Sequence, residues 1–169
     1  MVRRLRTVVL GLGNPILTDD AVGVRLAGAV KSALGDRPDV TVVEECSVGG
    51  LDLLDRLTGY ERAIVLDAIR TRGGRPGDCY RFTAAALRDT VNLTNVHDAN
   101  FATALELGRA LGHALPADED IHVFAVEVAD ERTFGTELSA DLAPRYPACR
   151  DLVLAEVGEL LGVPLASSP

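Results

Sequence analysis

Short apolar runs alternate with amphipathic segments along most of this chain. Runs rich in Val, Ile and Leu that are typical of buried strands occupy residues 5–13, 40–46, 63–69 and 121–128. Apolar residues recur at helical spacing over residues 20–35, 50–57, 100–112 and about 147–161. Residues 79–82, after the polar loop 70–77, are predicted to form an edge strand, whereas 84–96 shows no clear periodicity.

This order of elements predicts an α/β fold, a three-layer α/β/α sandwich. Its mostly parallel, twisted sheet has about five strands, one of them an antiparallel edge strand. The chain shows no repeat, low-complexity tract or linker, so we expect a single domain over residues 1–165 and a flexible tail over 166–169. Ligands of such sheets bind beyond the carboxyl ends of the strands, where successive connections leave in opposite directions. With the common strand order 2-1-3, that crevice lies between the first and third strands.

Polar residues gather at this predicted crevice. Asn14, Asp19 and Asp20 follow the first strand, and Asp67 ends the third. A carboxylate inside the apolar run 63–69 is costly to bury unless something compensates its charge. We therefore predict that Asp20 and Asp67 converge on one cation. Asp19 is interpreted as the N-cap of the following helix, where negative charge suits the helix dipole.

One histidine is predicted to complete the site. His97 lies in a loop just before the helix 100–112, from which it can reach over the edge of the sheet. His122 is interpreted as a packed strand residue, and His113 as a residue at a helix end or on the surface. Two carboxylates and one imidazole suit borderline divalent metals such as Ni²⁺ or Zn²⁺, and three protein ligands leave positions open for substrate or water.

Composition and charge narrow the class of protein. Apolar residues make up 47% of the chain and charged residues 25%, with a formal net charge of −8. An acidic surface without a basic block argues against binding to nucleic acid. The longest uncharged run is broken by glycines and a proline, which argues against a transmembrane helix. Three cysteines without CxxC spacing indicate reduced thiols, so we expect a cytoplasmic protein that does not bind membranes.

The segment 11–23, GLGNPILTDDAVG, resembles the opening signature of the hydrogenase maturation endopeptidases. That signature is G-x-G-N, four residues, Asp, an acidic residue and then x-x-G. Asp67-Ala68, Pro76-Gly77 and His97 follow in the order found in that family. The resemblance covers nearly the whole chain. It implies an endopeptidase that removes a C-terminal extension from the large subunit of a [NiFe] hydrogenase after nickel has been inserted.

The resemblance also implies roles for individual residues. Asp20, Asp67 and His97 correspond to the catalytic residues that contact nickel, which arrives on the precursor; other divalent cations are alternatives in vitro. The expected partner is the nickel-loaded large-subunit precursor, and the protein is expected to act as a monomer. Residues expected to contact the substrate are Asn14, Glu45, Gly49 and Gly50.

Two positions depart from the family pattern. Many relatives have Glu where this chain has Asp20, and the shorter side chain implies a tighter or shifted site. Relatives often carry an acidic residue followed by G-G-T after the second strand, whereas residues 45–50 read ECSVGG. The glycines of this loop are therefore displaced from the family position. If the loop contacts the substrate, the expected partner is an unusual hydrogenase.

The sequence leaves the chemistry of cleavage open. It contains no G-x-S-x-G elbow, no H-E-x-x-H helix and no credible Cys–His pair. Two routes remain: a metal ion polarises the carbonyl for attack by water, or Asp20 and Asp67 work as an aspartic-type pair. Both routes use an activated water and no covalent intermediate.

Three other functions fit parts of the pattern. A dinucleotide site would use Gly11-x-Gly13 and an acid at the end of the second strand, but Ile16 replaces the third glycine and Pro15 lacks a backbone donor. A phosphoacceptor switch domain would need a lysine near the last strand, and the one lysine of the chain is Lys31 in the first helix. A non-catalytic binding protein on the same fold is the third alternative.

Overall fold

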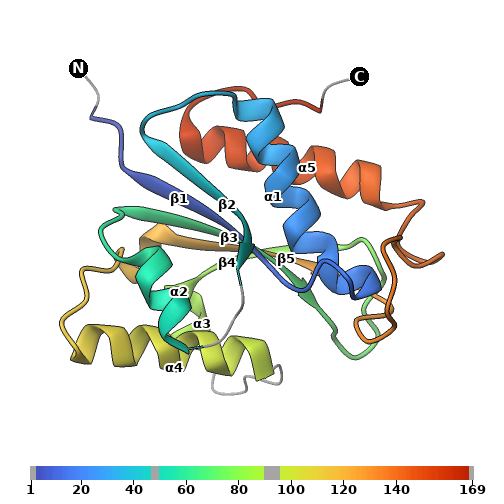
Figure 1. The fold of residues 1–169 in the computed structure, drawn as a ribbon, viewed down its shortest axis with the longest axis horizontal. Helices are drawn as coiled ribbons and strands as arrows, with labels where there is room; N and C mark the ends of the chain where they lie inside the picture. The colour runs from blue at the N-terminus through green and yellow to red at the C-terminus, as the bar shows by residue number, and fades with distance from the viewer. Residues whose placement is uncertain (1–2, 47–49, 90–95, 168–169) are drawn as a thin grey trace.

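A five-stranded sheet forms the centre of the protein (Figure 1). The computed structural model describes residues 3–46, 50–89 and 96–167, so the last two residues of the expected tail, 168 and 169, lie outside it. The strand order is β2-β1-β3-β5-β4. The first four strands in this order run parallel, and β4 is antiparallel to β5. The strands are β1 (Thr7–Leu12), β2 (Val40–Cys46), β3 (Arg62–Ile69), β4 (Cys79–Thr83) and β5 (Ile121–Glu127).

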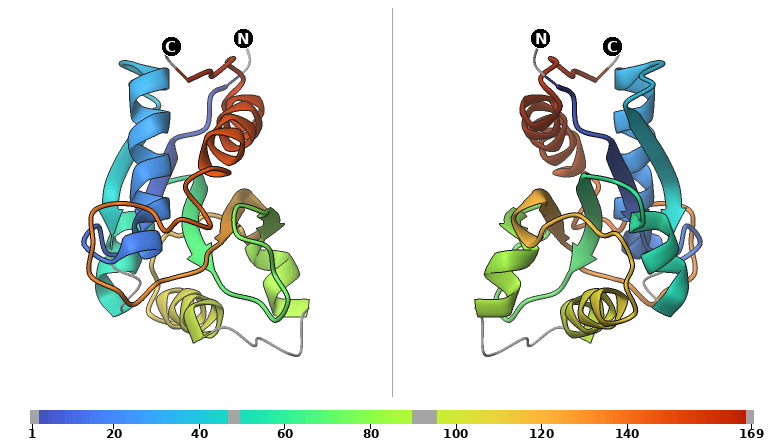
Figure 2. Two further views of the ribbon diagram at one scale, coloured as in Figure 1. Left: turned by 90° about the vertical axis from the view of Figure 1, so that its right-hand side faces the viewer. Right: turned by 90° about the vertical axis from the view of Figure 1, so that its left-hand side faces the viewer.

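Helices cover both faces of the sheet, which confirms the predicted three-layer fold (Figures 1 and 2). One face packs against α1 and α5, and the other against α2, α3 and α4. No helix in the described part of the chain is long and apolar enough to cross a membrane. The α-helices are α1 (Val22–Leu34), α2 (Gly50–Leu57), α3 (Ala84–Asp89), α4 (Val96–Ala110) and α5 (Tyr146–Leu161); the short 3-10 helices are η1 (Thr18–Ala21) and η2 (Asp118–Asp120).

The alternation of side chains along β3 decides which layer each residue faces. Ile64 and Leu66 belong to the core under α1 and α5. Ala63 and Val65 belong to the opposite core, under α2 and α4. Because successive side chains of a strand point to opposite faces, Asp67 is on the face that α2 and α4 cover.

Two of the predicted boundaries are wrong in a way that affects the site. The predicted helix 20–35 is divided into η1 and α1. Helix α4 begins at Val96, so His97 lies in its first turn and not in a preceding loop. The first residues of α4 are mainly polar, so their sequence lacks the apolar spacing that marks a helix. Packing of Phe101 and Leu105 into the core holds this helix in place.

Glycines allow α1 to begin in direct contact with the sheet. A Cβ atom on Gly23 would lie 2.3 Å from the carbonyl oxygens of both Leu12 and Leu66, the first in β1 and the second in β3. On Gly11, a Cβ atom would lie 2.5 Å from the Glu44 carbonyl oxygen. The backbones at the ends of β1 and β3 and at the start of α1 therefore pack without room for a side chain.

A pair of glycine substitutions in α1 tests this contact. We expect Gly23→Ala to lower the free energy of unfolding by at least about 2 kcal/mol, because the new methyl group meets backbone atoms that cannot move independently. Gly28→Ala is the matched control: its Cβ would lie 3.4 Å from Glu44 Oε1, the end of a flexible side chain. Alanine favours a helix by about 1 kcal/mol over glycine, so the control should be neutral or stabilising. Urea unfolding measures both; equal stability of the two variants would contradict the contact.

Candidate functional site

The two candidate carboxylates stand at the carboxyl edge of the sheet, where β1 and β3 end. Gly11 of β1 lies opposite Leu66 of β3, one residue before Asp67. Asp20 lies in η1, which contacts β3, and Gly23 then places the start of α1 against the Leu66 carbonyl. The left view of Figure 2 looks toward this side of the molecule. Asp20 and Asp67, 47 positions apart in the sequence, therefore lie at the same edge of the sheet.

A tight turn positions Asp20. Gly13 has a φ of +128°, and a Cβ there would lie 2.0 Å from the backbone oxygen of Asp20. The Asn14 N–H donates to Asp20 Oδ2 at 2.8 Å, and the Ile16 N–H donates to Asn14 Oδ1 at 3.1 Å. The half-buried Asp20 carboxylate is thus turned back over the end of β1, with Asn14 supporting the turn. The same bond occupies the Asn14 N–H, which a dinucleotide phosphate would need at this position.

Asp67 is almost completely buried, with 7% of its surface exposed. Its Oδ1 accepts a hydrogen bond of 2.8 Å from the N–H of Ala68, the next residue. The strand continues for two residues past Asp67, so this carboxylate lies just inside the edge of the sheet and not at its last residue. A central strand flanked by β1 and β5 holds it in place.

His97 is placed at the same edge by the direction of α4. Just beyond the carboxyl end of α4, Ala114 accepts a hydrogen bond of 2.8 Å from the Gly59 N–H. Gly59 precedes β3, so α4 ends at the amino edge of the sheet and begins toward the carboxyl edge (Figure 1). The His97 side chain lies outside the described residues. Among the side chains that the structure does describe, no three His, Cys, Asp or Glu residues form a cluster able to hold a metal ion.

The other two histidines lie away from this edge. His113 Nδ1 is 3.1 Å from the hydroxyl of Thr58, beyond the carboxyl end of α4. His122 is the second residue of β5, at the amino edge. Burial lowers the pKa of His122, and the positive charges of Arg81 and Arg62 lower it further. Both histidines therefore have the packing or surface roles expected from the sequence.

Asp19 is a buried structural carboxylate and not the N-cap of α1. The N-cap of α1 is Ala21, and Asp19 is 0% exposed inside η1. Its Oδ2 accepts hydrogen bonds from the N–H groups of Ala129 (3.0 Å) and Asp130 (2.9 Å). The Ser139 N–H donates to Asp19 Oδ1 and the Ser139 hydroxyl to Asp19 Oδ2, each at 2.7 Å. Four donors satisfy this carboxylate, which ties the loop after β5 to the start of α1.

A third buried carboxylate, Glu127, has no counterpart among the residues selected from the sequence. It ends β5 with 2% of its surface exposed. The N–H of Thr71 donates to its Oε1 at 2.7 Å, and the Thr71 hydroxyl to its Oε2 at 2.8 Å. A Cβ on Gly74 would lie 2.1 Å from the Glu127 carboxyl carbon. Glu127 thus holds the polar loop 70–77 against the sheet, and only its acidic character in an apolar strand signals this in the sequence.

The residues expected to bind substrate after β2 are only partly described. Glu45 is exposed near the end of β2, and Gly50 is the first residue of α2. Gly49 lies outside the described residues. The neighbouring Glu44, an alternative ribose ligand in a dinucleotide site, pairs with Lys31 at 2.6 Å. A phosphoacceptor domain would need a lysine near the last strand, whereas Lys31 lies in α1 and is paired with Glu44.

The thiol at the end of β2 is not set up as a nucleophile. Cys46 is buried, and its Sγ lies 3.9 Å from Asp52 Oδ2. Burial raises the pKa of this thiol to about 11, and the negative charge of Asp52 contributes to the shift. Since the thiolate is the reactive form, Cys46 is unreactive at neutral pH.

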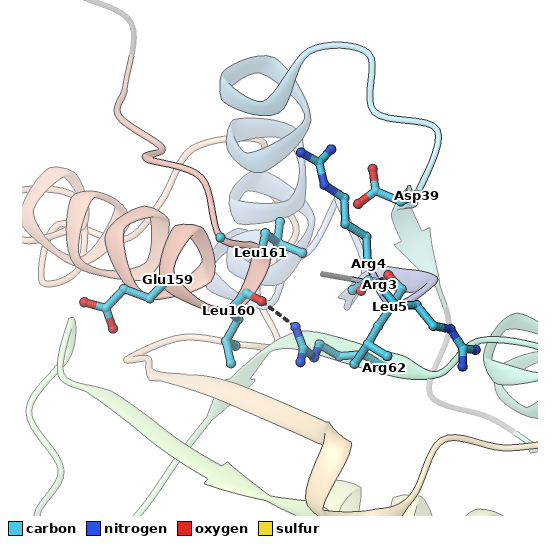
Figure 3. Close-up of a pocket in the computed structure, with 10 residues that line it drawn as sticks. Arg3, Arg4, Leu5, Asp39, Arg62, Glu159, Leu160 and Leu161 are labelled. Atoms are coloured by element: carbon cyan, nitrogen blue, oxygen red, sulfur yellow. Dashed lines mark hydrogen bonds between the residues drawn. The ribbon is translucent and has the colours of Figure 1, made fainter. Parts of the chain in front are cut away.

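A cavity of about 1040 Å³ lies at the opposite, amino edge of the sheet (Figure 3). Arg62 lines it and donates a hydrogen bond to the carbonyl oxygen of Leu160, near the end of α5. Asp39 lines it too, and is paired with Arg37. The cavity contains neither candidate carboxylate. Although this cavity is large, we assign the candidate site to the carboxyl edge, because ligands of parallel sheets bind there.

Comparisons with known proteins agree with the fold. A family model described as hydrogenase maturation protease matches residues 24–156, which include Asp67 and His97 but begin after Asp20. The chain is 31% identical over 114 residues to the hydrogenase 2 maturation protease of Escherichia coli (strain K12). That alignment covers 64% of this chain and 66% of the relative, just under two thirds of its length.

Solved structures show the same fold. The hydrogenase maturating endopeptidase HybD from E. coli is 24% identical, with a TM-score of 0.71 over 92% of this chain and 93% of that one. The [NiFe] hydrogenase maturation protease HybD from Thermococcus kodakarensis is 21% identical, with a TM-score of 0.69 over 92% of this chain and 99% of that one.

Substitutions of the neighbouring residues Asp19 and Asp20 test which of the two carboxylates stabilises the fold. Asp19→Asn places an NH₂ group or a weaker acceptor against four donors, so we expect the free energy of unfolding to fall by about 2–4 kcal/mol. Asp20→Asn makes the same exchange of an oxygen for an NH₂ group in a half-buried side chain, and we expect a clearly smaller loss of stability. Urea unfolding of the two variants measures the difference. An Asp19→Asn protein as stable as the wild type would show that the buried carboxylate does not hold the loop.

Proposed function

Because this chain belongs to the hydrogenase maturation protease family, we propose that it is an endopeptidase acting on the precursor of a [NiFe] hydrogenase large subunit. The cleaved segment is a C-terminal extension, and its removal completes maturation of the subunit. The observation that supports this best is the placement of Asp20 and Asp67 at one edge of the family's sheet. The first turn of α4, with His97, begins toward the same edge.

In this proposal, nickel belongs to the substrate. It reaches the protease already bound by the precursor, and Asp20, Asp67 and His97 contact it there. Two carboxylate oxygens and one imidazole nitrogen fit a borderline divalent ion whose other ligands come from the precursor. An incomplete ligand set of this kind recognises a metal held by another protein without binding the free ion tightly. Other divalent cations are expected to occupy the same position in vitro.

Cleavage is proposed to proceed through an activated water. The water oxygen bonds to the carbonyl carbon, the C–N bond breaks, and the leaving amine takes a proton. Either the substrate's metal polarises the carbonyl, or the Asp20 and Asp67 carboxylates share the proton as an aspartic-type pair. A covalent route through Cys46 is disfavoured, because its raised pKa keeps the thiol protonated.

Compartment and assembly belong to the same proposal. Cys46, Cys79 and Cys149 are free thiols. Reduced cysteines suit the cytoplasm, where thiols are kept reduced. We propose that the protein works there as a monomer that meets its precursor before the mature hydrogenase is assembled.

Substitutions of two histidines, one at the proposed site and one away from it, test the assignment. We expect His97→Ala to slow release of the C-terminal peptide from nickel-loaded precursor by about 10²- to 10⁴-fold, because it removes one of three groups at the reacting centre. Asp67→Asn should act similarly. His113→Ala, at the amino edge, is the matched control and should stay within about twofold of wild type. Mass spectrometry of the released peptide measures the rates; cleavage by His97→Ala at the wild-type rate would refute the assignment.

The metal state of the precursor provides a second test. Nickel-loaded precursor should be cut, and the same precursor prepared without nickel should remain intact, because the three ligands then have no ion through which to position the substrate. Adding Ni²⁺ to the metal-free precursor restores cleavage if the ion enters its site. Gel electrophoresis measures the processing of both forms. Equal processing would show that the protease does not require nickel on the precursor.

A further inference from the structure

Most basic side chains of this acidic protein already have a partner within the fold. Lys31, Arg109 and Arg145, for example, form ion pairs of 2.6–2.8 Å with carboxylates. In the described part of the chain, five arginine side chains form no hydrogen bond or ion pair. One of them, Arg4, lines the cavity at the amino edge of the sheet. The other four lie in the loops that leave the carboxyl edge: Arg70, Arg72 and Arg75 after β3, and Arg132 after β5.

Three of these arginines belong to one loop. Residues 70–77, RTRGGRPG, contain Arg70, Arg72 and Arg75 and no acidic residue, and all three arginines are exposed. Because the chain as a whole has a formal net charge of −8, this loop is a local excess of positive charge on an acidic protein. Of the three, Arg70 interacts with the negative charge of Asp130. The contacts of the fold therefore leave at least Arg72 and Arg75 available to a partner.

Two consecutive β-turns fix the shape of this loop. The first turn, residues 71–74, is closed by a hydrogen bond of 3.3 Å between the N–H of its last residue and the carbonyl oxygen of its first. The second, residues 75–78, is closed in the same way at 3.0 Å, and Gly77 has the positive φ, +90°, that suits its place after a proline. Glu127 holds both turns, because its carboxylate accepts from Thr71 and its backbone carbonyl accepts from the Gly77 N–H at 2.8 Å.

The turns also keep the three arginines within reach of one ligand segment. A β-turn brings its first and last Cα atoms within about 7 Å of each other, and consecutive Cα atoms are about 3.8 Å apart. The Cα atoms of Arg70 and Arg75, which flank the turn 71–74, are therefore at most about 15 Å apart, with Arg72 inside that turn. That span equals about four or five residues of extended polypeptide. Guanidinium groups bind carboxylates through paired N–H donors, so the loop fits a short acidic stretch of chain.

We propose that Arg70, Arg72 and Arg75 dock an acidic segment of the precursor polypeptide beside the candidate site. This inference rests on the proposed function, which makes a polypeptide the substrate. Arg70 follows Asp67 by three positions at the edge where β3 ends, so a segment bound by this loop lies next to the proposed chemistry. Charge complementarity determines the class of partner, because guanidinium groups without partners in the fold attract carboxylates. A long polyanion such as nucleic acid is disfavoured by the net charge of −8.

Reversal of charge in the turns tests the proposal. We expect Arg72→Glu and Arg75→Glu each to raise Kd for nickel-loaded precursor roughly 5- to 30-fold at low salt, measured in an Asp67→Asn background that slows cleavage. In the otherwise wild-type enzyme, KM should rise while kcat stays within about twofold. Salt should weaken binding by the wild-type loop more than binding by either variant. The melting temperature should not change, because these side chains have no partner in the fold.

The matched control is Arg4→Glu. Arg4 is also an exposed arginine without an ion pair, and its reversal changes the net charge of the protein by the same amount. It lies at the opposite edge of the sheet, so Kd for precursor should stay within about twofold of wild type. A Kd for both loop variants equal to that of Arg4→Glu would show that only the overall charge matters, and would overturn the proposal.

Reversal of charge in the precursor identifies the occupant. Clusters of Asp and Glu are changed to Lys one cluster at a time, and one of these changes should weaken binding to the wild-type loop. The same precursor should bind the Arg72→Glu protein more tightly than it binds wild type. Absence of such a rescue for every cluster overturns the acidic segment as the occupant. Weaker binding of a single-stranded RNA oligonucleotide, with unchanged binding of precursor, would assign the arginines to nucleic acid and overturn it too.

Failure of the docking loop and failure of the proposed function give different results. If wild type binds precursor through Arg72 and Arg75 yet never cuts it, the proposed function fails and the docking loop stands. If wild type cuts the precursor, and both loop variants bind and cut it as Arg4→Glu does, the docking loop fails and the proposed function stands.

Discussion

Direct contact between backbones, made possible by glycine, determines where the carboxylates of this protein lie. At Gly23 a side chain would overlap the carbonyl oxygens of β1 and β3, and at Gly13 it would overlap the backbone of Asp20. The chain can therefore leave β1, turn within a few residues and begin α1 on top of two strand ends. This tight return places Asp20 above the edge at which Asp67 is buried. A looser connection would keep the same fold but would separate the two carboxylates that the proposed chemistry needs.

The carboxyl edge is stiffened by buried charge that is not itself proposed to react. Asp19 accepts four hydrogen bonds and binds the loop after β5 to η1. Glu127 does the same for the loop after β3 through Thr71. A buried carboxylate whose hydrogen bonds are satisfied stabilises a single loop conformation, whereas an unsatisfied one is strongly unfavourable. Together these two residues hold two loops in fixed positions at the edge of the sheet that carries the candidate site. The structural role of Asp19 and the proposed chemical role of its neighbour Asp20 differ because the two side chains have different partners: Asp19 bonds the loop after β5, and Asp20 bonds Asn14 at the end of β1.

Local patterns were enough to predict the layers of this fold, but not the contacts between distant segments. The mostly parallel sheet was predicted from the alternation of apolar runs and helices, and the order 2-1-3 of its first three strands was expected because that order is common in such folds. The N-cap interpretation of Asp19 was wrong because its partners are more than 100 residues away and no sequence spacing signals them. The same applies to Glu127, whose donor Thr71 is 56 residues away. His97 was expected in a loop because the polar start of α4 lacks apolar spacing, although packing further along extends the helix to include it. The roles of Asp20, Asp67 and His97 remain predictions that the sequence, the edge placement and the family support.

The central claim is that Asp20, Asp67 and His97 meet around one ion. A crystal structure of the protein grown with millimolar Cd²⁺, recorded at a wavelength where cadmium scatters anomalously, tests it most directly. We expect one anomalous peak at the carboxyl edge, within about 2.5 Å of a carboxylate oxygen of Asp20, one of Asp67 and a ring nitrogen of His97. A His97 ring directed away from the two carboxylates, or an ion bound by other groups while these three point to separate places, would contradict the account.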